Sequence, residues 1–445
     1  MEQTFMKEKK ILPLVLSMSL PMMLSMLVNS LYNIVDSYFV AQISEQAMTA
    51  LSLVYPLQLL ETAIAVGFGV GMNAAAAYYL GAKEQQRADD IVTSGLILSL
   101  LHGVILMAAA LLFAPAFVSL FTENEKILAD GVKYSNLVFI FAVPNVIAIT
   151  FEKIFQAEGR MKVSMLSMLC GCVANIILDP LLIFGIGIFP KMGIEGAAIA
   201  TGIGQVIPLI VYLFVFIKHP VSLHFHWHKK VFQKQLMGQM YGVGIPATLN
   251  LALPSFMITA LNGILAVYSA SYVLVLGIYY KLQTFIYLTA NGIVQGIRPL
   301  VGYNYGAGEY DRVKKITHTS MGLIALVMVM GMAISCAIPQ QLMGLFTTSR
   351  ATMEIGGAAL RIISFGFVVS SVSVTFSGVL EGLGKGMPSL LISLARYIVV
   401  MLPVSFVLSR LLQASGVWYG FAVTEYIVAV LSYYIYKFHM RDIKG

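Results

Sequence analysis

The chain has 445 residues, of which 58% are hydrophobic and only 11% charged, with a formal net charge of +7 and a mean hydropathy of +0.84. Soluble domains average roughly 45–50% apolar and about 25% charged residues, so this composition excludes a soluble protein. It predicts an integral membrane protein, in which the positive charge collects on one side of the bilayer and indicates no nucleic-acid partner.

The first apolar stretch runs from Ile11 to about Val40. It is too long for a cleavable signal peptide and lacks a small-residue cleavage site, so it predicts a retained span. Further stretches of about 20 residues, the length that crosses ~30 Å of hydrocarbon, follow along the chain. Together they predict twelve transmembrane helices, at 12–40, 50–79, 91–113, 133–157, 164–186, 194–217, 238–268, 272–303, 315–338, 356–380, 388–411 and 417–437.

The second half of the chain repeats the first at a constant offset of 225 residues. Matching residues include Pro21 and Pro246, Tyr55 and Tyr280, Gln58 and Gln283, Gly71 and Gly296, and Glu84 and Glu309. Duplicated bundles are typical of secondary transporters, which bind substrate at the interface between the repeats. We therefore expect an all-α membrane protein with two six-helix lobes, 1–217 and 238–445, joined by a linker at 218–237.

Orientation follows from the basic residues between the predicted spans and near the ends of the spans. Most lie on the side that holds both termini and the linker, whereas the other side carries only Lys126, Lys133, Lys191, Arg350, Arg361 and Arg410. Because cytoplasmic loops carry an excess of Lys and Arg, both termini and the linker are predicted to be cytoplasmic. Six spans per repeat insert both repeats the same way up, as parallel repeats around a central cleft.

Acidic residues within the spans are the best candidates for chemistry, because a charge at mid-bilayer costs at least ~2.5–3.5 kcal/mol. They are Asp36, Glu61, Glu152, Asp179, Glu381 and Glu425. Asp36 lies on one helix face with Asn29 and Asn33, and Asp179 follows Asn175 by one helical turn. Carboxylate and amide oxygens favour a hard cation, and protonation is the alternative way to neutralise the two aspartates. Hydrogen bonding in helix packing is the structural alternative.

The remaining polar residues allow more than one interpretation. Lys281, Arg298 and Arg396 either line the cleft or pair with acids. Glu152, Lys153 and Glu381 lie near the cytoplasmic ends of their spans, which favours solvated or capping roles. Glu425 hints at a separate polar site in the second lobe. The His224, His226 and His228 pattern suits a metal, although such a run in a basic loop is more often solvated.

The arrangement resembles the multidrug and toxic compound extrusion (MATE) family over essentially the whole chain. The likeness rests on the 6+6 spans, on Asn33-x-x-Asp36, on Asn175-x-x-x-Asp179-Pro180 and on the segment Gly302-Tyr303-Asn304-Tyr305-Gly306-Ala307. The resemblance to the DinF-like branch implies that Asp36, Asn175, Asp179 and Thr201 hold the coupling cation, Na⁺ or H⁺. The NorM-like branch also has acids on spans 7 and 10, but here span 7 has none and Ser370 and Ser371 occupy span 10.

The resemblance implies an antiporter in the inner membrane of a prokaryote that exports amphipathic, mostly cationic drugs by alternating access. We expect it to work as a monomer without a cofactor, with Pro21 as the bend point of span 1. Supporting or cavity-lining candidates are Tyr32, Asn33, Gln58, Glu61, Gln283, Arg298 and Glu425. A flippase for lipid-linked precursors, with a basic cleft, is the alternative. An enzyme is disfavoured because the spans show no nucleophile and base cluster.

Overall fold

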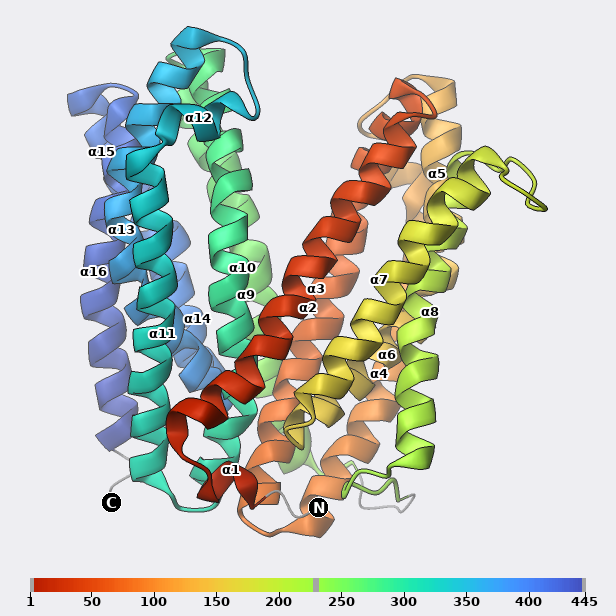
Figure 1. Ribbon diagram of the computed structural model, residues 1–445, viewed down its shortest axis with the longest axis vertical. Helices are drawn as coiled ribbons and strands as arrows, with labels where there is room; N and C mark the ends of the chain where they lie inside the picture. The colour runs from red at the N-terminus through yellow and green to blue at the C-terminus, as the bar shows by residue number, and fades with distance from the viewer. Residues whose placement is uncertain (1–3, 227–231, 442–445) are drawn as a thin grey trace. The chain divides into compact units, whose positions relative to one another are not determined.

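The computed structural model describes residues 4–226 and 232–441, and every regular element in these ranges is a helix (Figure 1). The helices of the first half are α1 (Phe5–Glu8), α2 (Ile11–Ala41), α3 (Glu45–Gly81), α4 (Gln85–Ser119), α5 (Glu125–Ile140), α6 (Ala142–Ala157), α7 (Met161–Phe184) and α8 (Ile194–Lys218). The second half has α9 (Lys234–Ala266), α10 (Ala270–Gly306), α11 (Tyr310–Ala337), α12 (Pro339–Gly344), α13 (Arg350–Gly382), α14 (Gly386–Leu394), η1 (Ala395–Val399), α15 (Met401–Leu412) and α16 (Ser415–Arg441).

The helix boundaries recur at the offset seen in the sequence. α3 and α10, α4 and α11, α5 and α13, and α7 and α14 each begin 225 residues apart. The caps recur as well, because Ser44 and Ser269 both precede a helix in extended backbone, and each side-chain oxygen accepts a hydrogen bond from a first-turn amide. Equivalent residues of the two halves therefore make equivalent local structure.

The chain forms two compact units that do not coincide with its two halves. Residues 24–244 belong to the first unit, and residues 4–23 and 245–445 belong to the second. The first part of α2 thus packs in the second unit, where Ser19 Oγ donates to the Ile293 carbonyl. The first part of α9 packs in the first unit, where the Tyr79 hydroxyl donates to Gln239. The division into two functional lobes, 1–217 and 238–445, stays a prediction.

Glycines on α3 and α10 allow the close approach of these segments. A methyl group at Gly71 would overlap the carbonyl oxygen of Met240 in the first unit. At the equivalent position in the second unit, a methyl group at Gly296 would stand 2.7 Å from Ser19 Cα. Only glycine allows backbone contact this close, so the shared glycines explain why the segments pack as they do.

Ten helical stretches in the described ranges are long and apolar enough to cross a membrane, counting residues 386–412 (α14, η1 and α15) as one, and the bent pair α5 and α6 makes an eleventh. This pair, predicted as one span, bends by 47° at Phe141. Pro144 explains the break, because it has no amide hydrogen to donate to Ile140. α16 covers the twelfth predicted span and is 27 residues long, although it is not among the ten.

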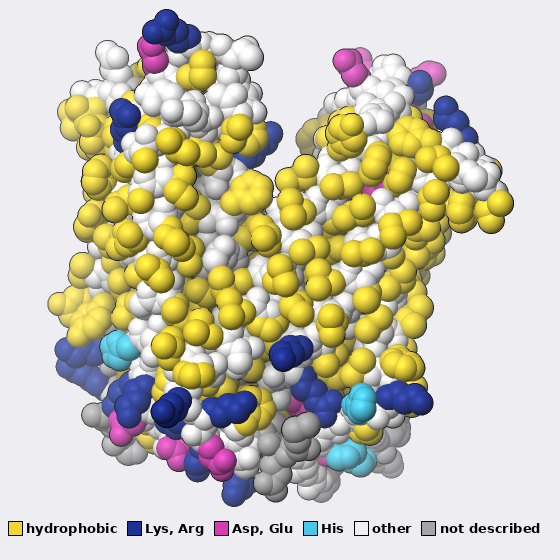
Figure 2. Space-filling view, in the orientation of Figure 1, with side chains coloured by type: hydrophobic (Ala, Val, Ile, Leu, Met, Phe, Trp, Pro, Cys, Tyr) yellow, Lys and Arg dark blue, Asp and Glu magenta, His cyan; other side chains and the backbone are white. Residues whose placement is uncertain are grey.

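The surface of each unit is banded. Hydrophobic side chains cover the middle of the face shown in Figure 2, and Lys and Arg gather mainly toward one end of each unit. In the second unit this is the end where α1 and the C-terminal end of α16 lie (Figure 1). An apolar band with basic residues at one end is typical of a membrane protein with those residues in the cytoplasm.

Candidate cation site and polar clusters

The predicted cation site is assembled in the first unit from α2, α7 and α8. Asp36 lies in the last turns of α2, Asn175 and Asp179 lie one turn apart on α7, and Thr201 lies in the second turn of α8. All four side chains are buried. Residues separated by more than 160 positions in the sequence therefore meet inside one unit. That they bind a cation stays a prediction.

Asn175 connects the members of the site. In the amide orientation that gives both of its groups a partner, its nitrogen donates to Asp179 Oδ2 and its oxygen accepts from the Thr201 amide, each at 3.2 Å. The carboxyl groups of Asp36 and Asp179 are close enough to hydrogen-bond to each other. Such a bond requires one shared proton, because two carboxylates are both acceptors.

Two buried oxygen atoms at this site, Asp36 Oδ1 and Thr201 Oγ1, have no hydrogen-bond partner within 3.5 Å among the described residues, although the Tyr134 side chain lies near Thr201. Leaving buried polar atoms unsatisfied costs about 1–3 kcal/mol each, so such atoms indicate a missing ligand or proton. The donor set consists of oxygens only, which suits Na⁺. The residues present thus fit either Na⁺ or a proton.

The supporting candidates near this site differ in their surroundings. Tyr32 and Tyr134 lie near Asp36, and Gln58 lies beside Tyr134. Asn33 is exposed and donates to the Asn29 carbonyl at 2.8 Å. The structure thus brings Tyr32 and Gln58 to the acid pair and leaves Asn33 on the surface.

Glu61 and Pro21 lie apart from the acid pair. The buried Glu61 carboxylate accepts a hydrogen bond from Asn145 Nδ2 at 3.0 Å, which joins α3 to α6. α2 continues through Pro21, two residues before the boundary between the two compact units. The bend at Pro21 stays a prediction.

Arg298, one of the predicted intramembrane basic residues, pairs with an acid. Arg298 Nη2 lies 2.6 Å from Glu381 Oε2, and Glu381 Oε1 accepts from Asn250 and Ser389. The predicted solvated or capping role of Glu381 is therefore wrong, because its carboxylate is buried. Lys281 stands 5.7 Å from the centre of the Phe346 ring.

A second acid–base pair, Glu152 and Lys153 in the first unit, is also buried. Lys153 Nζ lies 2.9 Å from Glu152 Oε1 and also donates to Gln156, and all three residues are buried. We expected Glu152 and Lys153 to be solvated because they lie near a helix end. Packing against α3, where Asn73 donates to the Lys153 carbonyl, removes them from water.

Glu425 belongs to a polar cluster in the second unit, as the sequence hinted. Arg396 Nη2 lies 2.7 Å from Glu425 Oε1 and also donates to the Tyr287 hydroxyl at 2.8 Å. Arg396 lies in η1, where the amide of Val400 bonds five residues back to Ala395. Such π-turns often mark functional sites, and here the turn carries the arginine that contacts Glu425 and Tyr287.

A cavity of about 220 Å³ adjoins this cluster within the second unit. Gln283, one of the predicted cavity-lining residues, lines it together with aromatic and polar side chains, among them Tyr280, Asn291, Tyr397 and Phe421. Glu425 Oε2 is buried without a hydrogen-bond partner among the described side chains. The cavity itself could not be predicted from the sequence, because its walls come from five elements, α9, α10, η1, α15 and α16.

Together, the apolar band and the long helices define a multi-pass membrane protein, and its first unit holds a buried pair of acids. A family comparison makes this specific. The MatE family model matches residues 21–181 and 246–407, and the two matches begin 225 residues apart. The chain belongs to the MatE family, and it is a transporter and not an enzyme.

Relatives and solved structures agree with this assignment. The chain is 27% identical over 445 residues to the multidrug export protein MepA of Staphylococcus aureus, covering 99% of this chain and 97% of MepA. It is also 27% identical to MepA of Staphylococcus haemolyticus, with 98% and 95% covered. An outward-facing multidrug resistance MATE transporter has the same fold, with a TM-score of 0.92 at 22% identity, covering 100% of this chain and 99% of that chain.

Proposed function

We propose that this protein exports amphipathic, mostly cationic organic compounds from a prokaryotic cell in exchange for Na⁺ or H⁺. Family membership and the multidrug export function named for its MepA relatives support the export of drugs. The observation that carries the ion coupling is the buried pair of Asp36 and Asp179, with Asp36 Oδ1 lacking a hydrogen-bond partner among the described residues. Both termini and the linker lie on the cytoplasmic side in this proposal.

In the proposed cycle, an external cation binds between Asp36 and Asp179 and removes their mutual repulsion. This changes which packing of α2 is most stable, and Pro21 lets the two parts of α2 move relative to each other. The empty and occupied states then differ in stability, as alternating access requires. Asn175 holds the carboxylate of Asp179 in place through its amide.

The ion site is proposed to exist in the first unit only, as in the DinF-like branch. The residues 225 positions after Asp36, Asn175 and Asp179 are Leu261, Val400 and Val404, which cannot bind a cation. α9 contains no acidic residue. Three of the four intramembrane basic residues that favoured a flippase, Arg298, Arg396 and Lys153, already face a carboxylate, and this supports drug export over a flippase.

Transport by purified protein in liposomes tests this proposal. Ethidium uptake or release is followed under an imposed Na⁺ gradient and, separately, under an imposed pH gradient. We expect one gradient to drive ethidium movement, and we expect Asp36→Asn and Asp179→Asn to abolish the driven component. Asp311→Asn is the matched control, because its side chain is 89% exposed on α11.

Unchanged ion-driven transport in Asp36→Asn would overturn the proposed coupling site. Thermal melting in detergent separates this outcome from a folding defect. Asn keeps the shape and one oxygen of Asp, so the variant should melt within a few degrees of the parent protein. Failure of either gradient to drive ethidium in the parent protein would overturn antiport of organic cations itself.

A further inference from the structure

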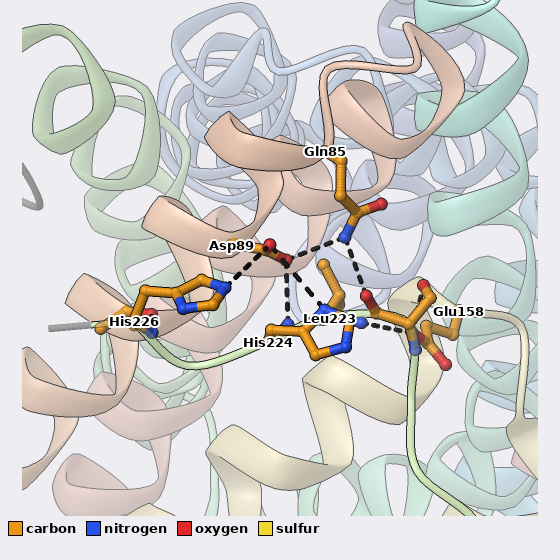
Figure 3. A network of polar contacts seen from close by, with 8 residues as sticks. Gln85, Asp89, Glu158, Leu223, His224 and His226 are labelled. Carbon is orange, nitrogen blue, oxygen red and sulfur yellow. Dashed lines mark hydrogen bonds and ion pairs between the residues drawn. The ribbon is translucent and has the colours of Figure 1, made fainter.

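Two histidines of the linker lie against a buried aspartate in the first unit (Figure 3). His226 Nε2 is 3.7 Å and His224 Nδ1 is 3.9 Å from the same oxygen, Oδ2 of Asp89 on α4. Asp89 is buried, whereas the two imidazoles are about 60% exposed. The sequence placed the histidines on one side of an extended strand but gave no sign of Asp89. His228 lies outside the described residues.

The carboxylate of Asp89 is held so that Oδ2 faces the imidazoles. Its other oxygen, Oδ1, accepts hydrogen bonds from Gln85 Nε2 at 2.8 Å and from the His224 amide at 2.9 Å. These bonds fix the rotation of the carboxylate, as outer-sphere hydrogen bonds do for carboxylate ligands of metals. Asp89 therefore presents one free, oriented oxygen.

The linker that carries the histidines is fixed by separate contacts. The His226 amide donates to Thr93 Oγ1, and Glu158 accepts hydrogen bonds from the Ser222 amide, the Ser222 hydroxyl and the Leu223 amide (Figure 3). Because alternate residues of extended backbone point the same way, His224 and His226 face the same carboxylate. Their ring centres are 6.0 Å apart.

Two of the three distances between the ligand atoms approach the spacing of a tetrahedral metal site. Zn–N and Zn–O bonds of about 2.0–2.1 Å place neighbouring ligand atoms about 3.4 Å apart. The three atoms here lie within 4.8 Å of one another, and the two oxygen–nitrogen distances exceed the ideal by only a few tenths of an ångström. Rotation of the exposed imidazoles can shorten these distances to the ideal spacing.

We propose that Asp89, His224 and His226 bind one divalent transition-metal ion of the Zn²⁺ class. Two imidazole nitrogens and one carboxylate oxygen are a common ligand set for such ions, and the exposed side leaves a fourth position for water. The bound ion ties the linker to the first turns of α4. The alternative without metal is an ion pair between the carboxylate and a protonated imidazole.

Metal binding to the full-length protein in detergent tests this site, after removal of any polyhistidine tag. Zn²⁺ binding is measured by titration calorimetry, and Co²⁺ serves as a spectroscopic probe of tetrahedral coordination. We expect one ion per chain, with visible Co²⁺ bands of a tetrahedral site. His224→Ala, His226→Ala and Asp89→Asn should each weaken binding at least tenfold, whereas the control His439→Ala, on α16 outside the linker, should not.

Two results would overturn the proposal: no binding near one equivalent, or equal affinity in the parent protein and the His224→Ala/His226→Ala double variant. Should Asp89→Asn fail to fold, the single histidine variants carry the test, since their side chains are exposed. The readout is metal binding, so it is independent of the proposed transport activity.

Discussion

Replacing Glu425 by Gln is expected to destabilise the second unit more than removing the whole ion pair does. In the parent protein, both Nε and Nη2 of Arg396 lie within 2.8 Å of Glu425 Oε1, and the two side chains are only 9% and 13% exposed. Glu425→Gln keeps the size and an acceptor oxygen but removes the negative charge. A guanidinium cannot lose its proton in a protein, so its charge stays buried.

The magnitude follows from what remains around the arginine. The Tyr287 hydroxyl at 2.8 Å and the faces of two tyrosine rings at 5.3 and 5.5 Å are weak, uncharged partners. Breaking a buried pair by removing one partner costs about 3–5 kcal/mol. An apolar replacement of both, Arg396→Met with Glu425→Leu, leaves no charge behind and should cost less than about 1.5 kcal/mol.

The assay is unfolding by SDS titration in mixed micelles, which gives the free energy of unfolding for each variant. Asp311→Asn is the control, since it removes the exposed pair with Lys314 and should cost under about 1 kcal/mol. The reasoning is refuted if Glu425→Gln costs no more than Asp311→Asn, or if the double variant costs as much as Glu425→Gln.

Two further substitutions probe packing and the linker. Gly71→Ala should lower the free energy of unfolding by about 1–3 kcal/mol, because the added methyl group overlaps with backbone. The control is Gly263→Ala, where the added methyl group meets no described atom within 4 Å. This control should be neutral or stabilising by up to about 1 kcal/mol in the same titration. Glu158→Ala should speed amide hydrogen exchange at Ser222 at least tenfold, because hydrogen bonds to a charged group contribute about 1.5–3 kcal/mol. The control Glu84→Ala should leave that exchange rate unchanged. Equal rates in the parent protein and both variants would contradict the role of Glu158.

The sequence predicted the helices well because apolar length and polar breaks are local signals. It missed the ends, since α4 runs from Gln85 to Ser119 whereas the predicted span was 91–113. Polar turns at helix ends continue beyond the hydrocarbon, and hydropathy does not detect them. The break at Phe141 was also missed, although Pro144 next to it is the residue that disrupts the helix.

Part of the site could be predicted because an acid inside a span stands out against its apolar neighbours. Asp36 and Asp179 were found this way, and the structure brings them together. Asp89 was not found, because its role depends on the path that the linker takes past α4. Glu152 and Lys153 were placed in water for a similar reason, since position along a helix does not show which neighbour covers it.

The exchange of segments between the two units has a consequence for synthesis. Residues 4–23 are translated first, but the partners of Ser19 and Met6 in their own unit are made 274 and 298 residues later. The first unit in turn lacks residues 234–244 of α9 until the linker has been translated. Neither unit can complete its packing while only half of the chain has left the ribosome. The first unit can therefore complete its packing once residue 244 has been translated, whereas the second unit waits for the end of translation. A chain truncated after the linker leaves the start of α2 without its partners.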